Sequence, residues 1–148
     1  MLSLFQRKRA SVAAAPSPTP ATDLPKGLLR PESAASLLAI PRRQKLLEHI
    51  WQRTSLSRKQ FAILYRAPLE CYAELVQQFP ASEAHHHAYP GGMLDHGLEI
   101  VAYSLKLRQS HLLPIGANPE DQAAQSEAWT AAVAYAALLH DIGKIAVD

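Results

Sequence analysis

Apolar residues recur at helical spacing along most of the chain from Ser33 onward. The pattern predicts a short helix that Pro41 ends or kinks, followed by a helix over Arg42–Arg53. Ser57 is suited to cap a third helix, and Pro68 is suited to the first turn of a fourth. No stretch alternates convincingly between apolar and polar residues with period two. The sequence therefore predicts an all-α fold.

A further helix is expected after the segment HHHAYPGGMLDHGLEIVAYSLKL, which begins at His85. Tyr89-Pro90-Gly91-Gly92 has turn chemistry, so the three preceding histidines are expected on a loop. The helix behind the turn has one apolar stripe through Leu94, Leu98, Val101 and Leu105, and a second through His96, Ile100, Tyr103 and Leu107. The solvent-exposed side of this helix is then expected to carry Glu99, Lys106 and Arg108. A lone histidine on an apolar face is more often a satisfied core residue than a metal ligand.

The segment SEAWTAAVAYAALLHDIGKIAVD, residues 126–148, predicts the last helix. Its apolar residues surround the helix axis, which indicates a position at the centre of the core. Burying the carboxylate of Asp141 beside His140 is costly, and a divalent cation compensates both groups at once. The alternative is an ion pair between Asp141 and Lys144, three residues apart. That pair explains the carboxylate but leaves His96 and His140 as separate coincidences.

His96, followed 44 positions later by LLHDIGK, resembles the first three quarters of the H…HD…D signature of the HD-domain metallohydrolases. The resemblance implies an HD-domain-like helical bundle in which His96, His140 and Asp141 hold a divalent metal ion, either Mn, Fe, Mg or Zn. It also implies that Lys144 faces the phosphate of the substrate.

The fourth ligand of that signature, an Asp on a later helix, has no counterpart here, because Asp148 follows Asp141 too closely. We therefore expect a domain over residues 33–148 that is truncated before its last ligand helix, or a degenerate copy. An incomplete site should leave the 148-residue chain catalytically silent, since small errors in the position of the attacking water are costly.

The stretch HHHAYPGGMLDHGLEI, residues 85–100, is similar to the segment that opens the HD domain of MobH-type relaxases of conjugative plasmids and integrative conjugative elements. The resemblance implies divalent-metal-dependent phosphodiester chemistry on DNA in the bacterial cytoplasm, with conjugation proteins as further partners. His85, His86 and His87 would act as general acid or bind the scissile phosphate. Tyr89 is a weak candidate for a covalent nucleophile.

Other functions fit the same residues. A similar pattern occurs in HD-type 3′–5′ exoribonucleases, so the motif alone does not choose DNA over RNA, and a nucleotide phosphohydrolase is also open. A non-catalytic DNA-binding or docking module would keep the fold with a partial site. The three consecutive histidines could equally form an exposed loop that chelates metals adventitiously.

The distribution of charge adds a separate feature. Residues 1–66 hold 12 Lys/Arg against 3 Asp/Glu, giving +9, whereas residues 67–148 hold 3 against 10, giving −7. Residues 1–32 are predicted to be a disordered, basic Pro/Ala-rich arm. We expect salt-sensitive affinity for nucleic acid from this basic part, or else a passive tail that aids solubility.

Cysteine content and hydropathy narrow the class of protein. Cys71 is the sole cysteine, which excludes an intrachain disulfide and a multi-cysteine zinc site and favours a cytoplasmic setting. No apolar run approaches the roughly 18 residues of a membrane-spanning helix.

Overall fold

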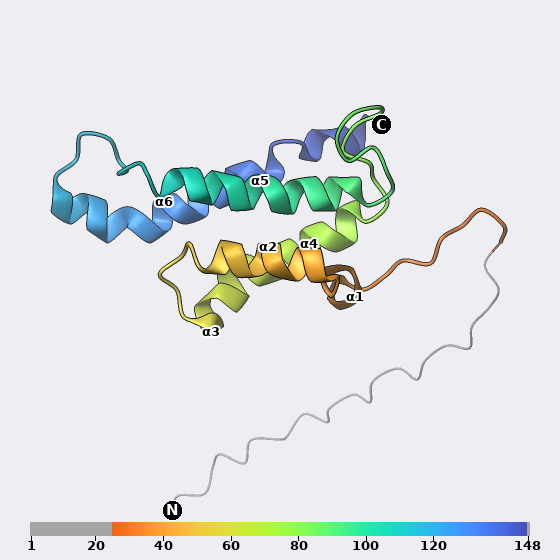
Figure 1. Cartoon of the computed structure of the whole chain (residues 1–148), viewed down its shortest axis with the longest axis horizontal. Coiled ribbons are helices and arrows are strands. Elements are labelled where there is room, and N and C mark those ends of the chain that lie inside the picture. The colour runs from red at the N-terminus through yellow and green to blue at the C-terminus, as the bar shows by residue number, and fades with distance from the viewer. Residues whose placement is uncertain (1–24, 148) are drawn as a thin grey trace, which may run out of the picture. The chain divides into compact units, whose positions relative to one another are not determined.

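The computed structural model describes residues 25–147, and within them residues 31–147 form one helical unit (Figure 1). Its elements are α1 (Ala34–Leu38), α2 (Pro41–Trp51), α3 (Arg58–Phe61), the π-helical turn η1 (Ala62–Arg66), α4 (Ala67–Val76), α5 (Gly92–Arg108), α6 (Pro119–Leu139) and the 3-10 helix η2 (Ile142–Ala146). The described residues contain no strand, so the predicted all-α fold is confirmed. Most of the predicted basic arm, residues 1–24, lies outside the described residues. Residues 25–30 belong to a separate unit.

The first two helices begin close to where the sequence places them. Ser33 caps α1, with its side chain accepting a hydrogen bond from the Ser36 N–H. α2 starts at Pro41 itself, because a proline in the first helical position has no N–H that would need a partner. The helix ends at Trp51, two residues earlier than predicted.

The third and fourth predicted helices are one continuous rod. Ser57 and Gln60 form a capping box at its start. α3 then passes through the wider turn of η1 directly into α4, so Pro68 lies in the second segment of a rod rather than at a new beginning. The buried residues of this rod are Phe61, Tyr65, Leu69, Tyr72, Ala73 and Val76. Leu75 of α4 is 55% exposed.

α5 is the central element of the core. Its stripe of Leu94, Leu98, Val101 and Leu105 is buried as predicted. The prediction of its solvent-exposed side is only partly right, because Glu99 and Arg108 are half-buried.

The prediction that the last helix is central is wrong. α6 packs mainly against α5 and, among the described residues, leaves Trp129 and Leu139 exposed. Many of its apolar residues are alanines, which favour a helix but expose little apolar area. A helix that is apolar all round can therefore lie at the edge when alanine dominates. Within residues 25–147 no helix is long and apolar enough to cross a membrane.

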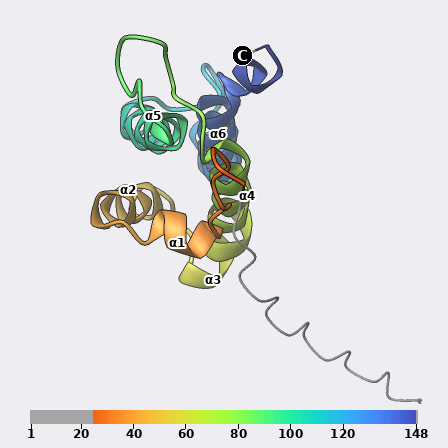
Figure 2. The ribbon, with the colours of Figure 1, turned by 90° about the vertical axis from the view of Figure 1, so that its right-hand side faces the viewer.

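The directions of three helices place the two halves of the site. Figure 1 shows α2 and α5 running side by side in the same direction, with their first residues at the same end of the bundle. α6 returns antiparallel to α5, so the last turn of α6 meets the first turns of α5. Figure 2, turned by 90°, shows α2 below α5 and α6 to the right of α5, above α4.

A close approach between α5 and α4 depends on Gly97. A Cβ at this position would lie 2.8 Å from Cε1 and 2.9 Å from the hydroxyl of Tyr72. Tyr72 is itself buried, and its hydroxyl donates to the Met93 carbonyl at 3.3 Å. Burial raises the pKa of Tyr72 to about 12, so the hydroxyl keeps its proton.

We expect Gly97→Ala to lower the free energy of unfolding by about 1–3 kcal/mol, because the ring of Tyr72 must move in a packed core. Urea unfolding followed by circular dichroism measures the change. Gly143→Ala is the matched control, since a Cβ there meets nothing within 4 Å. Equal stability of the two variants would contradict the close packing of α4 on α5.

Candidate metal centre

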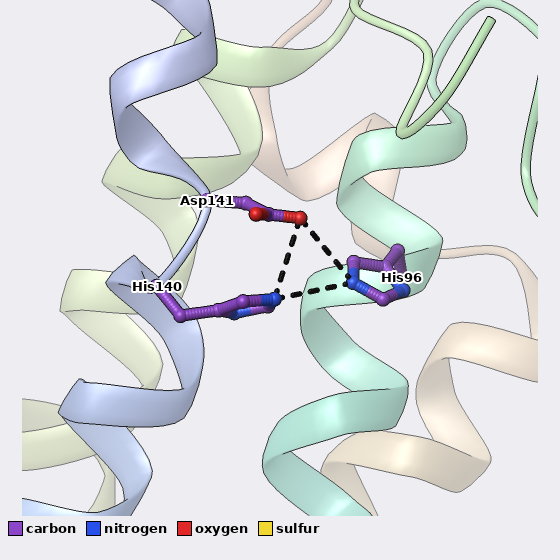
Figure 3. Close-up of side chains that lie close together, drawn as sticks. All are labelled: His96, His140 and Asp141. Carbon is purple, nitrogen blue, oxygen red and sulfur yellow. Dashed lines mark hydrogen bonds and ion pairs between the residues drawn. The ribbon is translucent and has the colours of Figure 1, made fainter.

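Three of the predicted ligands converge at one end of the bundle (Figure 3). His96 Nε2 lies 3.4 Å from His140 Nε2 and 3.6 Å from Asp141 Oδ2. The third side of the triangle, His140 Nε2 to Asp141 Oδ2, is 3.3 Å. His96, His140 and Asp141 are thus brought together by contacts across 44 residues of sequence.

The local sequence explains how each side chain reaches this place. His96 lies in the second turn of α5, on the side that faces the end of α6. His140 is the C-cap of α6, and Asp141 follows at φ −105°, where the chain leaves the α-helix and enters η2. The two ligands therefore project from a helix end, and His140 has 41% of its side chain exposed. The expectation that both histidines lie on buried helices is wrong for His140.

The imidazole of His140 is held in the tautomer that a ligand needs. Its Nδ1 lies 2.7 Å from the Ala137 carbonyl, which can only accept, so Nδ1 carries the hydrogen. In the neutral ring, Nε2 then has its lone pair directed into the triangle. Such a hydrogen bond from the second ring nitrogen is what orients histidine ligands in metalloproteins.

The charges around the triangle favour the deprotonated ligands. Burial, followed by the neighbouring His140, lowers the pKa of His96, so its imidazole is neutral near pH 7. Burial raises the pKa of Asp141, but the Lys144 ammonium and His140 outweigh it and the net pKa lies below its usual value. Neutral His96 and the carboxylate of Asp141 are therefore in the protonation states that a metal ion requires.

Lys144 forms the ion pair with Asp141 that the sequence offers as the alternative explanation. Its Nζ lies 2.7 Å from Asp141 Oδ2 and 3.0 Å from the Ala81 carbonyl. The pair compensates the carboxylate, but it leaves the meeting of the two histidines without a cause. An ammonium has three protons, so one remains for a further acceptor.

The triangle has the dimensions of a metal site. Ligands about 2.1 Å from a tetrahedral ion are about 3.4 Å apart, close to the three observed separations. Nitrogen and carboxylate oxygen donors suit Zn, Mn and Fe. Within the described residues, His96, His140 and Asp141 are the group of side chains that meets these distances. The residues therefore fit a divalent ion.

The three consecutive histidines lie on the loop before α5, as predicted, but the structure separates their roles. His85 and His86 are exposed. The side chain of His87 is only 12% exposed, and its ring centroid lies 5.8 Å from that of His96. His87 is thus the one of the three beside the candidate metal centre.

The Gly91-Gly92 pair lets this loop close on itself. His87 has a left-handed backbone with φ 60°, and its carbonyl accepts from the Ala81 N–H at 3.0 Å. Gly91, at φ 80°, begins α5 in the left-handed region that glycine tolerates. A Cβ on Gly92 would overlap the His87 carbonyl.

Behind His87 lies a buried polar network that the sequence analysis does not predict. Arg43 Nε lies 2.7 Å from Asp95 Oδ1, and both residues are buried. The Tyr89 hydroxyl donates to Asp95 Oδ2 at 2.9 Å and lies 3.0 Å from His87 Nδ1. The other ring nitrogen of His87 lies 3.0 Å from Glu99 Oε2. The signal in the sequence was Arg43, a charged residue on the same helical face as the buried Leu47 and Ile50.

The network also fixes the protonation of two of its members. Burial raises the pKa of Asp95, but its hydrogen bonds from Arg43 and Tyr89 outweigh this, and the net pKa is lowered. Burial and the hydrogen bond to Asp95 raise the pKa of Tyr89. A hydroxyl that is already engaged and reluctant to ionise is a poor nucleophile, which weakens the candidacy of Tyr89.

Comparison with known proteins gives a family. Residues 27–148 match the family TraI_2, described as "Putative helicase". The match covers most of the chain, and the chain belongs to this family. No curated protein and no solved structure matches it.

The buried ion pair predicts a change in acid stability. We expect Asp95→Asn to lower the free energy of unfolding at pH 7 by about 3–5 kcal/mol, because Arg43 is left buried without its partner. Since the pKa of Asp95 is lowered on folding, its contribution is present above the unfolded value and is lost as pH falls below about 4.

Urea titrations at several pH values test this expectation. The gap between the native protein and Asp95→Asn should narrow steadily from about pH 5 to pH 3. Glu120→Gln, which changes an exposed carboxylate on α6, is the control. A gap that stays constant across this range would show that Asp95 does not titrate as its contacts require.

Proposed function

We propose that this chain is the N-terminal, metal-holding HD-type region of a DNA relaxase of conjugative elements, acting on phosphodiester bonds in the bacterial cytoplasm. The observation that carries the proposal is the convergence of His96, His140 and Asp141 at metal-ligand separations. Membership of a family described as putative helicases adds support, because a helicase binds nucleic acid.

A bound divalent ion would supply Lewis-acid activation of a phosphate oxygen and a water of lowered pKa. His96, His140 and Asp141 would hold it. Lys144, next to Asp141, has one proton left to donate to a phosphate oxygen. His87 lies beside His96 and is the member of the histidine loop nearest the centre, and exchange of its contact with Glu99 would free Nε2 for a group bound there. We propose it as the phosphate-binding or proton-donating residue, with His85 and His86 contacting the substrate farther out.

Three protein ligands leave coordination positions open. Among the described residues no further carboxylate joins the three. We propose that the fourth, carboxylate ligand of an HD-type site comes from outside residues 25–147. Metal binding by the 148-residue chain should therefore be weaker than in a four-ligand site, and turnover by this chain should be very low.

The first test is metal content. Elemental analysis of the chain, equilibrated with Mn²⁺ or Zn²⁺ and freed of excess metal, should give about one ion per chain, as a site with three protein ligands can hold. Asp141→Ala and His140→Ala should each abolish it. His111→Ala, in the connection that follows the far end of α5, should not. Full occupancy in Asp141→Ala would remove the basis of the assignment.

The second test is strand cleavage by the complete product of the gene. We expect cleavage of end-labelled single-stranded DNA that requires Mn²⁺ or Mg²⁺ and is lost in His140→Ala, because the metal ligand is lost. The same oligonucleotide as RNA and a nucleoside triphosphate are the parallel substrates. Preference for RNA would favour an exoribonuclease, and preference for the nucleotide would favour a phosphohydrolase. DNA binding without any metal-dependent cleavage would favour the non-catalytic module.

A further inference from the structure

One exposed side of α5 leads away from the candidate metal centre. Tyr103 follows His96 by seven residues, so it lies on nearly the same helical face about 10 Å along the axis. Tyr103 is 66% exposed, and Lys106 one turn later is also exposed. The opposite stripe of α5 is buried, so nothing in the packing of the core requires an aromatic ring at position 103.

α2 carries a row of basic side chains on the same side of the molecule. Arg42, Lys45 and His49 are spaced at i, i+3 and i+7 and are all exposed. The contacts of Arg42 with Glu99 and of Arg43 with Asp95 fix the register of α2 against α5. Figures 1 and 2 show α2 and α5 side by side and running in the same direction. Because both helices have the same rise per residue, the register set by Arg42 and Glu99 brings Lys45 and His49 alongside the part of α5 that carries Tyr103.

Among the described residues, Arg42 is paired in this row, but the two lysines are not. The two carboxylates of α5, Asp95 and Glu99, are both engaged by arginines of α2. Within residues 25–147 neither Lys45 nor Lys106 has an ion-pair partner. An exposed aromatic ring flanked by unpaired lysines is the arrangement with which proteins bind single-stranded nucleic acid, since bases stack on the ring and phosphates meet the cations.

We propose that Lys45, His49, Tyr103 and Lys106 form a track for single-stranded DNA that leads to the candidate metal centre. This proposal rests on the proposed function, because the candidate metal centre defines where the track ends. It adds that the substrate is a strand that continues along α5 and not a mononucleotide. A base stacks on Tyr103, and the two lysines bind phosphates on either side of it. Positively charged α2 thus lines one side of the track, and α5 lines the other.

The experiment is fluorescence anisotropy of a labelled oligothymidine with the 148-residue chain in EDTA, so that binding does not depend on metal. We expect Tyr103→Ala to weaken binding about tenfold at every salt concentration, because a stacking partner is lost. Tyr103→Phe keeps the ring and should bind like the native protein. The double variant Lys45→Ala/Lys106→Ala should reduce the slope of log Kd against log salt by about 1.4, for two phosphate contacts.

Controls separate this proposal from the metal assignment and from general charge. Lys59 is an exposed lysine on α3, away from the track. Lys59→Ala should change the slope of log Kd against log salt by less than about half of the change expected for one phosphate contact. Because the titrations are run in EDTA, failure of the metal assignment would leave the dependence on Tyr103 and on the two lysines unchanged, so the two proposals fail separately. Circular dichroism verifies that each surface variant is folded.

Three results would overturn the track. The first is unchanged affinity in Tyr103→Ala, and the second is an unchanged salt slope in the double lysine variant. The third is a competition experiment in which thymidine monophosphate displaces the labelled oligothymidine from the protein as effectively as unlabelled oligothymidine does at equal phosphate concentration. Tighter binding of the RNA oligomer than of DNA, with the same Tyr103 dependence, would overturn the choice of DNA.

Discussion

The buried pair between Arg43 and Asp95 is the interaction on which the candidate site depends. It joins α2 to the first turn of α5, and Asp95 is the residue immediately before His96. Arg43 also donates to the Leu37 carbonyl, and the second oxygen of Asp95 accepts from Tyr89. Because both oxygens of Asp95 and two nitrogens of the Arg43 guanidinium form hydrogen bonds, these bonds offset part of the cost of burying the two charges. One carboxylate therefore fixes the helix pair and, through Tyr89, the loop that presents His87.

The sequence reveals most of the helices and the three candidate ligands, because these signals are local. Helix starts at Ser33 and Ser57 follow from capping chemistry, and the buried stripe of α5 follows from spacing alone. The His140-Asp141 dipeptide stands out as polar chemistry at the end of an apolar helix. Its meeting with His96 is different, since the distance in sequence gives no contact, and the expectation came from a family resemblance.

What the sequence does not reveal depends on tertiary contacts. In the sequence, Arg43 is one of many cationic residues in the basic half of the chain. In the structure it is buried, because it forms an ion pair with Asp95 from another helix. Glu99 reads as solvated, yet it bridges Arg42 and His87. The edge position of α6 was missed because hydropathy counts an alanine as apolar without weighing its small area. In each case the pattern within one helix is ambiguous until its neighbours are known.

The π-helical turn between α3 and α4 has a consequence for how the family can vary. Its wider winding keeps Phe61, Tyr65 and Leu69, spaced by four residues, on one side of the rod. The five residues of this turn wind through about the angle that four residues cover in an α-helix, so deleting one of them and restoring ordinary winding would leave α4 in nearly the same phase. A deletion within α4 before Tyr72 has no wider turn to absorb it and would rotate the residues beyond it by about 100°. Tyr72 would then leave its place against Gly97, so a single deletion should be far better tolerated in the π-helical turn than in α4.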